Sequence, residues 1–230
     1  MSRKRKVKLA IIDNAVDHEI YRPVEHWSPH LNVPWETFEA KSGSLPDPEA
    51  GFSHFIITGS EASVLEREAW AEAETDLIRR IVRKGAAVLA SCWGHQLLAY
   101  ALLGRGAVRR CRQPEIGWIP VDIPASADVL GGPSQAYSFS LHYDEVAETG
   151  GLFDVLASSP LCPIQAMALK GGRCWGFQIH PEIDVESGRR LLKDSLGLNP
   201  RNDPLVRAAL HSEPRDSGLV HRIVKIFLAS

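Results

Sequence analysis

The sequence lacks several features that would point at once to a class of function. Only four of its 230 residues are cysteines, at positions 92, 111, 162 and 174. No two of them have the Cys-x-x-Cys spacing of a structural zinc site, so we expect no metal. We also expect no cofactor, and no disulfide because no secretion signal is recognised. No apolar run approaches the length of about 18 residues that a transmembrane helix needs. The formal net charge of −2 gives no electrostatic reason to expect nucleic acid or a membrane as a partner.

The remaining composition is that of a globular protein. Apolar residues make up 44% of the chain and charged residues 23%. Residues 1–6 are basic and predict a solvated tail, because the apolar segment 7–13 that follows is too short for a secretion signal. With no repeat, low-complexity tract or linker, we expect one cytoplasmic domain over 1–230, with a helical C-terminal part over 183–230.

Hydrophobic periodicity predicts an α/β fold. We expect an open, mostly parallel sheet that is flanked by helices and carries an antiparallel extension, with the functional site at the carboxyl ends of the parallel strands. The expected strands are 7–13, 31–38, 52–58, 86–91, 116–123, 136–141, 154–158 and a hairpin of 166–170 with 174–179. The expected helices are 66–84, 95–103, 185–196 and 218–228, and 197–215 is expected to be a loop or a segment that contacts a partner.

Cys92 stands where a strand is expected to turn sharply into a helix. The apolar run 86–91 precedes it, and Gly94 and an apolar-periodic segment follow it. Such a turn holds a side chain clear of the sheet, and the N-terminal N–H groups of the helix favour a thiolate. The alternative is that Cys92 is a small buried hydrophobic residue, as most free cysteines are.

His180-Pro181-Glu182 supplies the groups that a thiol nucleophile would need. Pro181 ends the second strand of the hairpin and fixes its own φ, which holds the two flanking side chains in a set relation. A nucleophilic thiol requires a base, and the base requires an orienting acceptor. The tripeptide alone could equally be a simple turn that ends a strand.

Three ordered motifs resemble the class I glutamine amidotransferase domain, particularly its free-standing members, such as glutaminases of the GMP synthase type, and the related γ-glutamyl peptidases. The motifs are Cys92-Trp93-Gly94-His95-Gln96, Glu115-Ile116-Gly117-Trp118 and His180-Pro181-Glu182. The resemblance runs from about residue 7 to about 182 and implies a flavodoxin-like fold. Any one motif would be weak, whereas their order and spacing make the resemblance specific.

The resemblance implies roles for the catalytic groups. Cys92 would be the nucleophile, His180 the general base and acid, and Glu182 the residue that orients the histidine. The backbone amides of Gly59 and Trp93 would form the oxyanion hole, and such donors are worth about 3–4 kcal/mol each in acyl transfer. Gly59 alone could also be an ordinary turn at the end of a strand.

The resemblance also implies substrate contacts. Gln96, on the helix after the nucleophile, would contact the amino acid end of the substrate, although it could equally face solvent. The backbone around Ser140 and Leu141 would hold the amino acid group, and His142 would shape the site. Asp144 could contribute to this segment or simply cap a turn.

Three positions depart from the family pattern. Ala90 stands where the family usually has glycine, Glu61 where it often has proline, and Trp93 where an aliphatic residue or phenylalanine is usual. None of these changes removes a catalytic group. Glu61 is expected to alter the rigidity of its loop and to place a carboxylate near the mouth of the pocket.

Taken together, these features predict cysteine-dependent hydrolysis of the γ-amide of glutamine through a γ-glutamyl thioester. The sequence has no P-loop, so a separate synthase would accept the ammonia. One alternative is a self-sufficient γ-glutamyl peptidase or amide hydrolase that acts on a larger compound. A third possibility is a noncatalytic regulatory or binding protein on the same fold.

Overall fold

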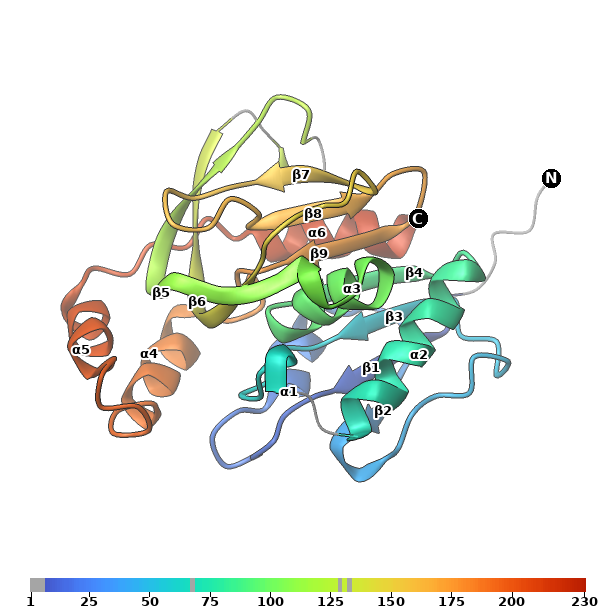
Figure 1. Cartoon of the computed structure of the whole chain (residues 1–230), viewed down its shortest axis with the longest axis horizontal. Coiled ribbons are helices and arrows are strands. Elements are labelled where there is room, and N and C mark those ends of the chain that lie inside the picture. Colours follow the sequence, from blue (N-terminus) through green and yellow to red (C-terminus); the bar gives the residue numbers. More distant parts are fainter. Residues whose placement is uncertain (1–6, 67–68, 128–129, 132–133) are drawn as a thin grey trace.

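Seven strands form one mixed sheet in the computed structural model of the protein, which describes residues 7–66, 69–127, 130–131 and 134–230 (Figure 1). The strand order is β2-β1-β3-β4-β9-β8-β7. The parallel strands are β1 (Leu9–Asp13), β2 (Trp35–Glu39), β3 (His54–Ile57), β4 (Ala87–Ser91) and β9 (Cys174–Phe177). The antiparallel extension consists of β8 (Ala166–Leu169) and β7 (Phe153–Ala157).

Helices cover both faces of this sheet. In β1, Ala10 and Ile12 belong to one apolar cluster, and Leu9 and Ile11 to another, as expected for alternating strand side chains. The first cluster includes α2 (Ala69–Arg83) and α3 (Trp93–Leu103), and the second includes α6 (Leu219–Ala229), which lies behind the sheet in Figure 1. The predicted α/β fold class is confirmed.

Element boundaries differ from the predictions where local chemistry intervenes. β2 begins at Trp35, directly after Pro34, because proline cannot donate to a strand ladder. α3 begins at Trp93, two residues earlier than expected, so that Cys92 lies between strand and helix with no intervening loop. The helix expected over 66–84 is α2, and a separate 3₁₀ turn precedes it at Val64–Glu66.

Two long strands form a second sheet, which the sequence did not predict. β5 (Val108–Ile123) pairs antiparallel with β6 (Ser134–Val146), whereas we expected short strands that extend the main sheet. Among the described residues, one isolated bridge joins β6 to the segment after β9, and in it His180 N–H donates to Phe139 O over 2.8 Å. Pro181 has no N–H group and therefore does not continue the ladder.

The C-terminal part is more helical than expected. α4 (Val185–Asp194) is followed by α5 (Asp203–His211), which lies in the segment expected to be a loop. Pro204 in the first turn favours the start of α5, and Ala209 packs against Gly117 of β5. A short helix, α1 (Pro23–Trp27), was also not predicted.

Two remaining expectations concern the chain ends and membranes. Residues 1–6, the predicted basic tail, lie outside the described residues. Within the described part of the chain, none of the helices has both the length and the apolar character of a membrane span.

Candidate active site

Cys92 occupies a strained turn between β4 and α3. Its φ of 46° and ψ of −108° make it the one non-glycine residue with positive φ in the part of the chain that the structure describes. Such strain costs on the order of 1–3 kcal/mol and clusters at functional sites. Gly94 permits the turn, because a Cβ there would collide with the carbonyl oxygen of Ile57. The N–H of Cys92 donates to Phe177 O over 2.7 Å, which ties the turn to β9.

His180 and Glu182 lie together beside this cysteine. His180 Nδ1 is 2.9 Å from Glu182 Oε1, and both side chains are buried. The imidazole also hydrogen-bonds the Cys92 side chain. Phe139 flanks the ring, with centroids 6.3 Å apart. The structure thus brings the three predicted catalytic residues into one connected group.

The electrostatic surroundings favour a protonated His180. Burial alone would lower its pKa, but the charges of Cys92 and Glu182, and hydrogen bonds to both, outweigh burial and raise the pKa to about 10. An imidazolium can donate a proton to a departing nitrogen. The geometry therefore suits general acid chemistry at the cysteine.

Gly59 lies two residues beyond the end of β3, against the histidine ring. A Cβ at this position would be 2.8 Å from His180 Cε1 and 3.0 Å from the Tyr21 hydroxyl oxygen. Only glycine therefore fits here without moving these side chains. Trp93, the other expected oxyanion residue, is buried, and its indole stacks on Trp70 with centroids 5.0 Å apart.

The loop after β1 brings Tyr21 to the site, which sequence reasoning missed. The Tyr21 ring meets the His180 ring edge-on, with centroids 6.1 Å apart. Burial raises the Tyr21 pKa, with smaller contributions from Glu182 and Cys92, and its hydroxyl is buried without a partner among the described residues. A single tyrosine ahead of a short helix carries no motif, so no local signal marked it.

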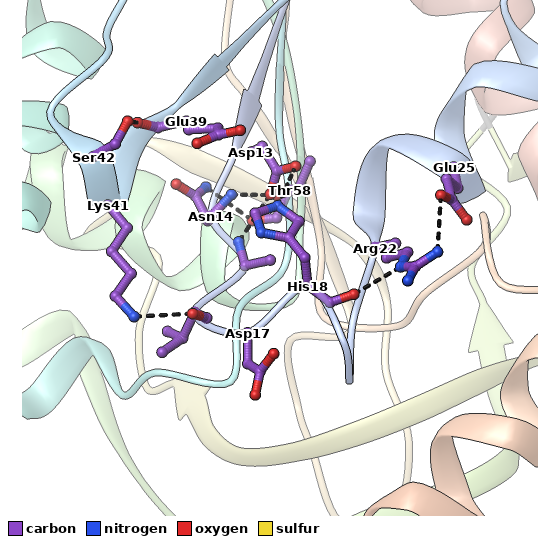
Figure 2. Close-up of polar contacts among 12 residues, drawn as sticks. Asp13, Asn14, Asp17, His18, Arg22, Glu25, Glu39, Lys41, Ser42 and Thr58 are labelled. Carbon is purple, nitrogen blue, oxygen red and sulfur yellow. Dashed lines mark hydrogen bonds and ion pairs between the residues drawn. The ribbon is translucent and has the colours of Figure 1, made fainter.

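Many polar contacts fix the loop that carries Tyr21. Figure 2 shows several of them at the carboxyl end of β1. The two oxygens of Glu61 accept from the backbone N–H groups of Val16 and Asp17, over 2.9 and 3.1 Å. The other contacts are Lys41 Nζ to Val16 O at 2.9 Å, His18 Nε2 to Asp13 Oδ2 at 3.1 Å and Asn14 N to Thr58 Oγ1 at 2.9 Å.

Gln96 is buried and points into the protein. Its Nε2 donates to Asp144 O over 2.8 Å and to Gln178 Oε1 over 3.2 Å. The solvent-facing alternative for Gln96 is therefore wrong. A turn-capping role for Asp144 is also wrong, because Asp144 lies within β6, where its carboxylate accepts from Ser63 Oγ over 2.5 Å and pairs with Arg110 over 3.0 Å.

The segment 140–142 of β6 borders the cysteine. Leu141 O lies 3.9 Å from Cys92 Sγ. Ser140 is fully buried, and the ring of His142 is held at both nitrogens, by Asp144 O at 3.0 Å and by Glu115 Oε2 at 3.1 Å. This arrangement leaves the backbone of Leu141, rather than the ring of His142, nearest the nucleophile.

One buried cluster has the composition of a metal site. Glu115, His142 and Cys162 each offer one ligand atom, and these atoms lie within 4.8 Å of one another. Ser159 and Gln165 also donate to the Glu115 carboxylate, which is thus already hydrogen-bonded. Burial raises the pKa of the Cys162 thiol, which disfavours the thiolate that a metal would require. These contacts form a hydrogen-bonded network around Glu115 that supports the ring of His142.

A pocket of about 250 Å³ opens in front of Cys92. Six of the nine predicted site residues line it, and Gly59, Ser140 and Glu182 are not among its lining residues. The six are Cys92, Trp93, Gln96, Leu141, His142 and His180. Glu182 instead supports His180 from behind, through the bond to Nδ1.

A cysteine at a strained strand-to-helix turn, with a histidine and a carboxylate at the carboxyl edge of a parallel sheet, is typical of α/β acyl-transfer enzymes. Residues 10–197 match the family described as Glutamine amidotransferase class-I. The chain belongs to this family.

The curated relatives include longer proteins. The chain is 34% identical over 168 residues to a glutamine-hydrolyzing GMP synthase from Aeropyrum pernix, covering 72% of this chain and 30% of that protein. It is 41% identical over 113 residues to one subunit of the glutamine-hydrolyzing GMP synthase of Saccharolobus solfataricus, covering 48% of this chain and 59% of that relative. The chain thus matches less than two thirds of either relative.

Solved structures share the fold at low identity. A glutamine amidotransferase from Thermotoga maritima superposes with a TM-score of 0.81 at 20% identity, covering 98% of this chain and 100% of that one. A second glutamine amidotransferase, from Methylobacillus flagellatus, superposes with a TM-score of 0.70 at 19% identity, covering 96% of this chain and 89% of that one. These similarities extend over nearly the whole chain, including the second sheet and the C-terminal helices.

Proposed function

We propose that the protein hydrolyses the γ-amide of glutamine, or of a related γ-glutamyl compound, through a thioester on Cys92. The observation that carries this proposal is the position of Cys92 at a strained turn, in contact with an imidazole that is itself bonded to Glu182. Backbone strain of this kind costs free energy and clusters at functional sites.

The reaction proceeds in two steps. The Cys92 thiolate attacks the γ-carbonyl carbon, the C–N bond breaks, and the leaving nitrogen takes a proton from His180. Water then attacks the thioester with His180 as base, the C–S bond breaks, and glutamate leaves. Glu182 keeps the imidazole oriented, and the N–H groups of Gly59 and Trp93 stabilise the oxyanion in both steps.

The amino acid end of the substrate would bind at the β6 side of the pocket. Gln96 and Leu141 line the pocket there, and Ser140 is buried beside Leu141 on β6. His142, which also lines the pocket, is held rigidly by Glu115. Rigid support matters because placement errors of about 1 Å can cost on the order of 10²-fold in rate.

The names of the relatives support a destination for the ammonia. Two of them are named as a GMP synthase and as one subunit of such a synthase. We propose that a separate synthase protein receives ammonia from this chain, which would then work in the cytoplasm as one domain over 1–230. A self-sufficient γ-glutamyl hydrolase is the second candidate, and the apolar part of the pocket favours it.

The test is glutamate release from glutamine by the purified protein. Cys92→Ala should abolish turnover, whereas Cys174→Ala, which removes a buried thiol outside the pocket, should leave it unchanged. Mass spectrometry of the parent protein should detect a γ-glutamyl adduct on Cys92 during turnover. Equal glutamate release by Cys92→Ala would overturn the thioester mechanism. No turnover of glutamine or other γ-glutamyl amides, with or without a synthase partner, would favour a noncatalytic role.

A further inference from the structure

The pocket at Cys92 has two unlike sides. On the β6 side, Ser63, Arg110 and Asp144 line it together with Gln96. Asp144 pairs with Arg110 over 3.0 Å, so one cation and one anion stand side by side. This pairing complements a free α-amino acid group, which also carries one charge of each sign.

The pocket also has an apolar wall, which we define as Ile20, Ile183, Leu191 and Leu198. Ile20 comes from the loop after β1, Ile183 from the segment after Glu182, Leu191 from α4, and Leu198 from the turn after α4. Leu198 is 63% exposed, as single apolar surface residues commonly are. Of the other members, Ile183 and Leu191 are buried and Ile20 is partly exposed. Apolar side chains from several segments that line one pocket suit an apolar group of a ligand.

The chemistry decides which side receives the leaving group. A general acid must lie within hydrogen-bond reach of the nitrogen that it protonates, so the departing amine must be next to His180. Ile183 places the apolar wall next to this histidine, because its N–H donates to His180 O over 3.2 Å. Ile183 and Leu191 also share an apolar cluster with Phe139, whose ring flanks His180. Ammonia would leave this wall uncovered, whereas an organic amine would bury it.

We propose that the amine released at Cys92 carries an alkyl or aryl group, which binds on the apolar wall. This inference rests on the proposed function and names its substrate class, a γ-glutamyl amide of an apolar amine. The overall reaction is γ-glutamyl amide plus water giving glutamate plus the free amine. The amine takes its proton from His180, and no other reactant is needed.

The experiment compares glutamine with γ-glutamyl-n-butylamide. Butylamine is more basic than ammonia and is the poorer leaving group, so faster turnover of the butylamide would report binding of the butyl group. We expect kcat/KM for the butylamide to exceed that for glutamine by about 10-fold or more. γ-Glutamylglycine, whose leaving group carries a carboxylate, should be a poor substrate because the wall offers that charge no partner.

Substitutions in the apolar wall test whether it causes the preference for the butylamide. Leu198→Asp should lower the ratio of the two kcat/KM values about fivefold, and Ile20→Ala, on the opposite loop, should lower it less. Leu161→Asp is the matched control, since Leu161 is 43% exposed and does not line the pocket, and it should leave the ratio unchanged. Both exposed leucines can be changed without opening the core, and circular dichroism checks folding.

The outcomes separate the two proposals. A preference for glutamine over the butylamide, or a ratio that Leu198→Asp does not change, overturns the leaving-amine site and leaves glutaminase activity standing. Such a result would assign the wall to a docked protein partner. Absence of Cys92-dependent glutamate release from both amides overturns the proposed function and the inference with it.

Discussion

Replacing Gly59 by alanine tests whether the position of His180 controls the rate. The backbone N–H is kept, and Gly59 lies outside the left-handed region, so alanine adds a clash and no backbone strain. Its methyl group would be 2.8 Å from His180 Cε1, whereas carbon atoms pack at about 3.5 Å. The ring must therefore move by about 0.7 Å, away from its position 2.9 Å from Glu182.

The expected result is a fall in kcat of about 10- to 100-fold, since misplacement by about 1 Å costs on the order of 10²-fold. Overpacking should also lower stability by about 1–3 kcal/mol. The assay is steady-state glutamate release, with thermal unfolding measured in parallel. Gly106→Ala is the matched control, because a Cβ at Gly106 meets nothing within 4 Å and its φ is not positive. If Gly59→Ala keeps kcat within about twofold, tight placement of His180 does not limit the rate.

Two further substitutions test the charges. Glu182→Gln keeps the side-chain shape but removes a charge that raises the pKa of His180. We expect kcat to fall on the order of 10²- to 10⁴-fold. Because His180 would lose its proton at a lower pH, the loss of activity at high pH should also begin at a lower pH. An unchanged pH–rate profile would contradict this role. Burial raises the pKa of Glu74 to about 8, partly offset by the hydrogen bond from Asn14. The folded state therefore keeps a proton that the unfolded state loses. The free energy of unfolding should fall as the pH rises from about 5 to 8, by at most about 1.4 kcal/mol per pH unit. In urea unfolding, the free energy of unfolding of Glu74→Gln should depend less on pH than that of the parent protein. Parallel pH dependences would refute the raised pKa of Glu74.

The parallel core and the nucleophile turn were predictable because their signals are local. Apolar runs end at Ser91, and Gly94 follows the cysteine at the spacing that a close strand–helix contact needs. The pairing of His180 with Glu182 was also predictable, since Pro181 fixes two residues that are neighbours in sequence. Periodicity and short motifs carry this information without knowledge of the tertiary fold.

The rest of the site depends on contacts between distant segments. Tyr21 reaches His180 across about 160 residues of sequence, and its only local context is a loop. Asp144 resembled a turn cap because β6 was expected to end at residue 141, whereas pairing with β5 carries the strand through to Val146. Strand length here is set by the partner strand, which single-sequence patterns do not report.

Glu61, where the family often has proline, fixes its loop through hydrogen bonds to the loop after β1. A proline would stiffen its own loop by fixing one φ angle. Glu61 instead uses both carboxylate oxygens to accept from the N–H groups of Val16 and Asp17, and so joins its loop to the one that carries Tyr21. It lines the pocket as expected, but its hydrogen-bonding capacity is directed at the protein. Its effect on substrate choice should therefore act through the position of Ile20, a member of the apolar wall on that same loop, rather than through direct attraction of a cation.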